Sequence, residues 1–116
     1  MKIDNLILFQ KMYDFSLWLM PHMEKFPKIQ RFALAKSINE ITIELLSEIV
    51  SMNYEKVREE KTRKVDEINI KLDQLRIMIR LSKDFKYISL NQYQYAIERL
   101  EEIGKITGGF RKGDKI

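Results

Sequence analysis

The sequence predicts an all-α protein: a single domain over residues 1–116, folded as an antiparallel up-down four-helix bundle. Apolar residues recur at three- and four-residue spacing through most of the chain. Only two Pro and four Gly occur among its 116 residues, too few for the many tight turns of a β domain. A chain of this length buries enough surface to fold without a disulfide or metal, and it contains no Cys.

The first helix is predicted over about residues 5–20, where Pro21 ends or kinks it. Its core stripe is expected to comprise Leu6, Phe9, Tyr13, Leu17 and Met20. A second set widens that face: Leu8, Met12, Phe15 and Leu19.

The second helix is predicted over about residues 28–52, with Pro27 in its first turn, where a missing N–H costs nothing. Its apolar residues, from Phe32 to Met52, cover about half of the helix circumference. A simple surface helix needs less, so this helix is expected to be extensively buried.

The third helix is predicted over about residues 54–85. A regular 3-4-3-4 spacing, typical of an antiparallel bundle, marks its buried seam: Val65, Ile68, Leu72, Leu75 and Ile79.

A second apolar stripe lies roughly opposite that seam and comprises Ile70, Ile77 and Leu81, with Ile88 as a further candidate. A helix in a monomeric bundle needs one buried face, so two opposed stripes favour self-association through this surface. The alternative is that these side chains are simply exposed or covered by a loop.

The fourth helix is predicted over about residues 90–107. Ser89 and Gln92 have the spacing of a capping box at its start. Gly108 and Gly109 are expected to end it in a left-handed conformation, leaving a basic tail over residues 108–116.

Positive charge is unevenly distributed along the chain. The net charge is +4, and residues 56–86 alone carry ten basic and six acidic residues. This pattern favours a polyanion or an acidic partner, and the candidate binding residues are Lys28, Arg31, Arg63, Lys64, Arg76, Arg80, Lys83, Arg111 and Lys112. The helix dipole would also favour an anion near Lys28 and Arg31. The alternative is a solvated face with local ion pairs, such as Asp73 with Arg76.

The sequence does not favour an enzyme. His22 is the one histidine, and it is expected in a turn without a partner that would tune it for acid–base work. The acidic clusters around Glu44 and Glu101 are predicted on polar faces, whereas a metal site in a bundle needs carboxylates that point inward. No catalytic residue, metal site or cofactor is therefore expected. A membrane span or secretory signal is not expected either, which favours the cytoplasm.

Two long segments, Leu8 to Ile38 and Leu72 to Lys112, resemble the Avd accessory proteins of diversity-generating retroelements. The most specific parts are Lys25-Phe26-Pro27-Lys28 with Gln30-Arg31-Phe32, Leu75-Arg76 with Arg80-Leu81, and Ile103-Gly104 with Gly108-Gly109. A related four-helix family, encoded in intervening sequences of bacterial ribosomal RNA genes, shares much of the pattern. That family is the alternative, with an RNA-related or unknown role and no reverse transcriptase partner.

The resemblance implies a non-enzymatic four-helix protein that forms a homopentameric barrel. Such proteins bind the element's reverse transcriptase and nucleic acid, RNA or also DNA, and support mutagenic copying of the template-repeat RNA. Lys28 and Arg31 match the family's basic pair after Phe-Pro, and Arg76 and Arg80 match its paired arginines. Phe110 stands where the family has Trp, so the role of that ring is not carried over.

Overall fold

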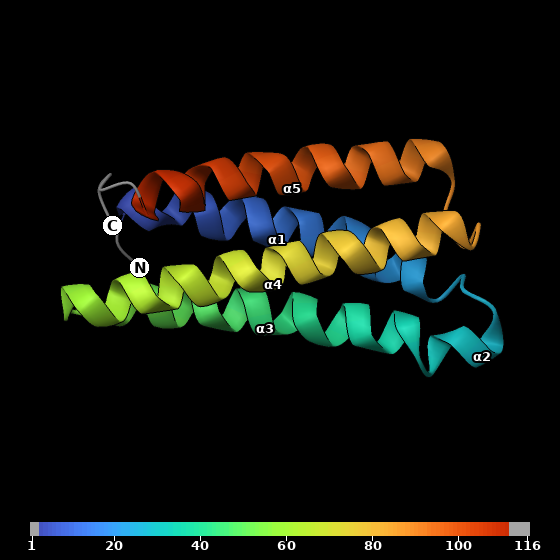
Figure 1. Cartoon of the computed structure of the whole chain (residues 1–116), viewed down its shortest axis with the longest axis horizontal. Helices are drawn as coiled ribbons and strands as arrows, with labels where there is room; N and C mark the ends of the chain where they lie inside the picture. Colours follow the sequence, from blue (N-terminus) through green and yellow to red (C-terminus); the bar gives the residue numbers. More distant parts are fainter. Residues whose placement is uncertain (1–2, 112–116) are drawn as a thin grey trace.

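The computed structural model describes residues 3–111, with side chains from Leu6 onward. Four long helices and one short helix make up this part of the chain, which contains no strand (Figure 1). The helices are α1 (Ile3–Met23), α2 (Lys28–Arg31), α3 (Leu34–Tyr54), α4 (Arg58–Asp84) and α5 (Leu90–Arg111). The all-helical prediction is confirmed, and the arrangement is compatible with a four-helix bundle.

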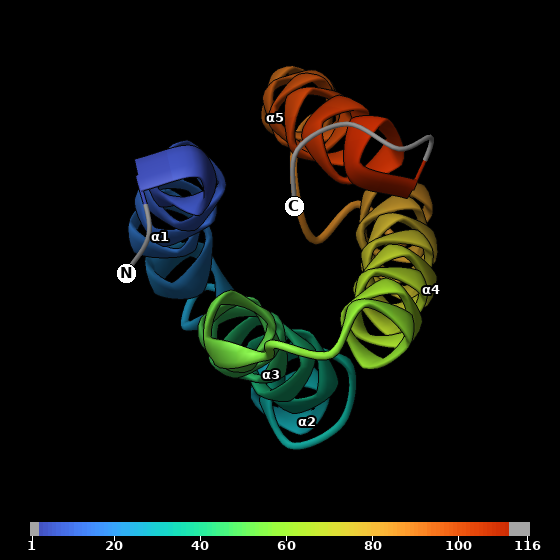
Figure 2. The same cartoon turned by 90° about the vertical axis from the view of Figure 1, so that its left-hand side faces the viewer.

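The four long helices surround one apolar core (Figure 2). The predicted seam of α4 is confirmed, because Val65, Ile68, Leu72, Leu75 and Ile79 are all at most 1% exposed. Each of the other long helices adds a similar stripe, including Met12 of α1, Leu45 of α3 and Leu100 of α5.

The predicted core stripe of α1 is wrong. The fully buried side chains are instead those expected only to widen it: Leu8, Met12, Phe15 and Leu19. Leu6, Tyr13 and Leu17 are exposed. This helix is apolar on most of its circumference, so spacing alone did not determine which of its two stripes faces the core.

α1 also continues two residues beyond Pro21, to Met23. Met23 is buried in the core, which favours completing the turn. The ring nitrogen Nδ1 of His22 lies 2.7 Å from the carbonyl oxygen of Trp18, within hydrogen-bond distance. The only histidine is thus a half-buried helix residue rather than a turn residue.

The helix predicted over residues 28–52 is two helices. It is interrupted at Phe32 and Ala33, where Ala33 leaves the helical region with φ −121° and ψ −93°. α2 has no buried residue, and the side chain of its Ile29 is 81% exposed. A helix depends mainly on burial of one face, and this short helix has no buried face that would keep it in line with α3.

The third predicted helix begins four residues later than expected, at Arg58, because Tyr54 belongs to α3. Val57 is extended, and its N–H donates to the Glu55 carboxylate at 3.2 Å. The side chains of Tyr54 and Val57 are exposed, so no apolar burial favours a helix here.

The capping box at the start of α5 is confirmed. The Ser89 N–H donates to Gln92 Oε1 at 2.8 Å, and the Gln92 N–H donates to Ser89 Oγ at 3.1 Å.

The predicted end of α5 at Gly108 and Gly109 is wrong, since the helix runs through both glycines to Arg111. Phe110 is 7% exposed and joins the core, and Arg111 pairs with Asp66 of α4 at 2.8 Å. These contacts offset the cost of glycine in a helix, which is about 1 kcal/mol each. The remainder of the predicted tail, residues 112–116, lies outside the described part of the chain.

Candidate nucleic-acid interface

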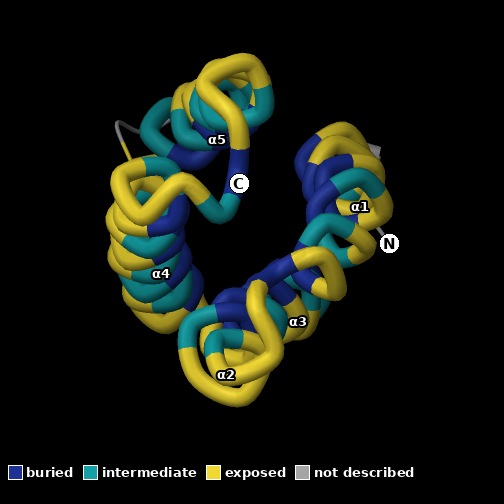
Figure 3. Tube along the Cα trace, turned by 90° about the vertical axis from the view of Figure 1, so that its right-hand side faces the viewer, coloured by how far each residue is buried: buried dark blue, intermediate teal, exposed yellow. Residues whose placement is uncertain are grey.

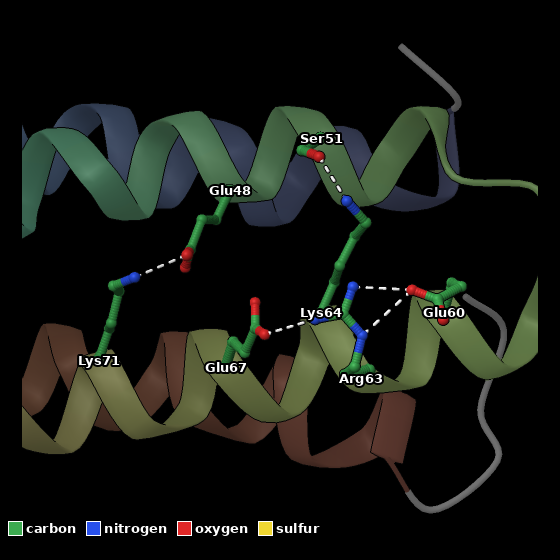
Figure 4. Close-up of polar contacts among 7 residues, drawn as sticks. All are labelled: Glu48, Ser51, Glu60, Arg63, Lys64, Glu67 and Lys71. Carbon is green, nitrogen blue, oxygen red and sulfur yellow. Dashed lines mark hydrogen bonds and ion pairs between the residues drawn. The ribbon is translucent and has the colours of Figure 1, made fainter.

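Arg63 and Lys64 lie on a charge-balanced part of α4 facing α3 (Figure 4). Arg63 pairs with Glu60 and Glu67, each at 2.7 Å, and the hydrogen bond to Glu60 raises the pKa of Arg63. Lys64 donates to Ser51 Oγ at 2.8 Å. Residues 55–67 carry five basic and five acidic residues, so this region has no excess charge to attract a polyanion.

A third basic residue of the same face, Lys71, bridges α4 to α3. Its Nζ lies 2.6 Å from Glu48 and 3.7 Å from Glu44. The hydrogen bond to Glu48 raises the pKa of Lys71 despite some desolvation. These carboxylates therefore serve the helix interface.

Arg76 is turned toward α5 rather than into solvent. Its Nη1 donates to Asp73, and its Nη2 donates to the backbone carbonyl of Leu100 at 3.1 Å. A Cβ at Gly104 would lie 2.6 Å from that Nη2, so the absence of a side chain there leaves room for the guanidinium. Arg76 thus positions α4 against α5, a role that its place among the candidate binding residues did not indicate.

Arg80 and Lys83 lie in the last turns of α4, on the end of the molecule that also holds α2. The Arg80 side chain is 72% exposed, and its carboxylate neighbour Asp84 is 3.9 Å away. Lys83 pairs with Asp84 at 3.1 Å and sits 4.7 Å above the Tyr93 ring. Of these two residues, Arg80 offers the more available charge.

Lys28 and Arg31 are both exposed on α2. The expected help from a helix dipole is not found, because α2 has four residues and aligns few peptide dipoles. Both charged side chains nevertheless lie on the surface, beside that of exposed Lys25.

The connection between α1 and α3 and the turn between α4 and α5 lie at the same end of the molecule (Figure 1, Figure 3). The rings of Phe26 and Tyr87, one from each connection, are 5.3 Å apart. We call residues 24–31 and 80–86 with Phe32 the basic end. These segments contain six basic and two acidic residues, in contrast to the balanced residues 55–67.

The basic end presents aromatic rings that the sequence did not single out. Phe32 is 76% exposed and Phe85 is 58% exposed, and the Phe85 ring stacks on Tyr87 at 5.5 Å. Lys86 follows Phe85 with a positive φ of 65°, and its side chain is also exposed. An aromatic residue within two positions of a basic one in a helix connection is the signal that could have identified this site.

The last two predicted binding residues are Arg111 and Lys112, and neither belongs to the basic end. Arg111 is engaged with Asp66 of α4. Lys112 falls outside the described residues. Of the nine predicted residues, the structure therefore gathers Lys28, Arg31, Arg80 and Lys83 at one end and places the described others in helix contacts.

One further carboxylate lies between two helices. Glu102 of α5 accepts from Lys11 of α1 at 3.2 Å and from Arg99 at 2.9 Å. Within the described residues, no group of three or more Asp, Glu or His side chains could hold a metal ion. None of the described helices is both long and apolar enough to span a membrane.

Exposed cations beside exposed rings can bind a nucleic acid in two ways. The cations attract backbone phosphates, and the rings can stack on unpaired bases. The basic end of this all-helical protein combines these two features, exposed cations and exposed rings.

The bAvd-like family model matches residues 6–113. The chain therefore belongs to the bAvd-like family, consistent with the Avd accessory proteins that the sequence resembles. This is a family of accessory proteins. No curated protein and no solved structure matches the chain.

Proposed function

We propose that this protein is a non-enzymatic accessory protein of a diversity-generating retroelement. It binds the element's reverse transcriptase and the template-repeat RNA, and so supports mutagenic retrohoming in the cytoplasm. The protomer is an antiparallel up-down bundle, and five copies assemble into a barrel. RNA is the expected ligand, and DNA is a second nucleic acid to be compared with it.

Family membership supports the accessory role, and the basic end carries the nucleic-acid part of the proposal. Six basic residues against two acidic ones in these segments provide an excess of positive charge. Phe32 and Phe85 provide rings for stacking that does not depend strongly on base identity. This combination favours single-stranded RNA over a duplex, whose bases are already stacked.

The proposal is tested by fluorescence anisotropy with a labelled single-stranded RNA at several KCl concentrations. The double variant Arg80→Glu with Lys86→Glu should weaken binding by about tenfold or more and flatten the salt dependence. The Lys56→Glu variant reverses one exposed charge in the connection before α4 and should bind nearly as the native protein does. Equal loss in both variants, or unchanged binding in the double variant, contradicts the assignment of the basic end.

The reverse transcriptase part is tested separately. A reverse transcriptase gene and a pair of near-identical repeats are expected beside the gene for this protein. Co-expressed tagged protein should retain that reverse transcriptase through gel filtration. Separate elution of the two proteins contradicts this part and favours the intervening-sequence alternative.

A further inference from the structure

Two helices of one protomer present exposed apolar stripes. On α4, three residues of the stripe predicted from the sequence are exposed, with Ile70 at 58%, Ile77 at 67% and Leu81 at 43%. Ile88, the further candidate for that stripe, lies beyond the end of α4 and is buried in the core instead. On α1, the stripe that fails to reach the core is exposed in the same way, with Leu6 at 44%, Tyr13 at 43% and Leu17 at 61%. Apolar side chains aligned on an exposed surface indicate a site where a partner binds.

The two stripes have the same spacing. Each takes a seven-residue step and then a four-residue step, so Leu6 corresponds to Ile70, Tyr13 to Ile77 and Leu17 to Leu81. The separation is 64 positions in all three pairs. Seven and four residues are nearly whole numbers of helical turns, so each stripe is a straight line of side chains along its helix.

The stripes also lie at the same height along the molecule, as contacts through α5 establish. α5 meets α4 in reverse order: Asn69 with Thr107, Arg76 with Leu100, and Lys83 with Tyr93. Two residues beyond Tyr93, Tyr95 is thus level with Leu81, and its ring lies 4.5 Å from Trp18 of α1.

A second contact gives the same alignment. Glu102 of α5 lies between Leu100 and Thr107 in sequence, so it is level with Gln74 of α4. Glu102 also forms an ion pair with Lys11 of α1. Trp18 is thus level with Leu81 and Lys11 with Gln74. The α1 stripe therefore matches the α4 stripe in height to within about one residue, or about 1.5 Å.

The stripes belong to opposite corners of the bundle. α1 and α4 each have α3 and α5 as their principal neighbours, and they lie on opposite sides in the end view (Figure 2). Neither stripe can cover the other within one protomer. On the α3 side, the α1 stripe borders a shallow apolar cavity of about 300 Å³, lined by Tyr13, Leu17, Met20 and Leu46 among others.

We propose that the α1 stripe of each copy binds the α4 stripe of the next copy. The inference deepens the assembly in the proposed function and rests on it, because it names the two surfaces that join the copies. Two different surfaces form the contact, so it is head-to-tail rather than two-fold. Since the matched residues lie at equal heights, successive copies are displaced little along the bundle axis, which is the condition for such a series to close into a ring rather than rise as a helical filament.

Cysteine cross-linking tests this pairing directly, because the native chain contains no Cys. The double variant Tyr13→Cys with Ile77→Cys should form disulfides between copies under mild oxidation, giving a ladder on a non-reducing gel that ends at a fixed number of copies. Disulfides need Cα atoms within about 7 Å, so the shifted pair Tyr13→Cys with Ile70→Cys, about 10 Å out of register, should cross-link at least tenfold more slowly. Each single variant should remain largely unlinked.

Other outcomes overturn the pairing. Efficient dimers from Ile77→Cys alone indicate a two-fold α4 contact, and equal cross-linking of matched and shifted pairs indicates random collision. Light scattering of the native protein separates the two proposals. An oligomeric mass without cross-links in the matched pair rejects this interface but leaves the assembly standing. A monomeric mass rejects both, whereas RNA binding by the basic end is measured independently.

Discussion

The guanidinium of Arg76 donates a hydrogen bond to the Leu100 carbonyl, 3.1 Å away across the α4–α5 interface. A helix carbonyl in mid-helix already accepts one bond from its own helix, so the arginine uses its second lone pair. The side chain is 30% exposed and also pairs with Asp73. The residue thus joins two helices, and its charge is largely committed within the protomer.

The Arg76→Ala variant should lose about 1–2 kcal/mol in the free energy of unfolding, because a hydrogen bond from a charged donor is removed. Urea denaturation followed by circular dichroism measures the loss. The Arg80→Ala variant is the control and should change stability by less than about 0.5 kcal/mol, because its ion pair is long and exposed. Similar losses in both variants contradict the structural role of Arg76.

The Gly108→Ala variant should raise the unfolding free energy by about 1 kcal/mol. Gly108 is helical, and a Cβ there meets nothing within 4 Å, so alanine gains helix propensity without a clash. The matched control is Gly104→Ala, whose Cβ would displace the Arg76 guanidinium from 2.6 Å. It should gain less or lose stability. Destabilisation by Gly108→Ala would mean that α5 ends at the paired glycines.

The Ser89→Ala variant should lose about 1 kcal/mol, because Ser89 Oγ accepts the Gln92 N–H at the start of α5. Chemical denaturation measures the change. Asn91→Ala alters an exposed residue in the same turn and serves as the control. If both substitutions have equal effects, the capping bond does not stabilise the helix start.

Acid should weaken the contact between α1 and α5. The hydrogen bond from Lys11 lowers the pKa of Glu102. A carboxylate whose pKa is lower in the folded state stabilises the fold above its ordinary pKa, and this contribution disappears as pH falls through the lowered value. The Tm of the protein should therefore fall as the pH is lowered from about 5 to about 3. The Lys11→Met variant should show a flatter dependence over that range, and an unchanged slope contradicts the assignment.

Much of the helical arrangement could be predicted from spacing alone. α4 also carries a second stripe, but only its seam keeps an unbroken 3-4-3-4 spacing, from Val65 to Ile79, and that regularity identifies the buried face. α1 carries two apolar stripes, and choosing between Tyr13 and Met12 as core residues requires the positions of α3 and α5. The end of α5 was wrong for a similar reason, since burial of Phe110 is a tertiary contact that outweighs the local preference of two glycines.

The basic end was only partly predictable. Charge along the sequence identified Arg80 and Lys83, but it did not distinguish them from Arg63, which has two carboxylates within one helical turn. The place of Phe85 in the basic end depends on the contact between Phe26 and Tyr87, two residues that are far apart in sequence. Contacts of that kind carry no local pattern.

The basic end lies at one tip of the longest dimension of the protein, 44 Å against 23 and 20 Å across. The basic end has four more positive than negative charges, whereas residues 55–67 have none in excess. Under the proposed function, a nucleic acid would meet Phe32 and Phe85 at one tip of an elongated molecule.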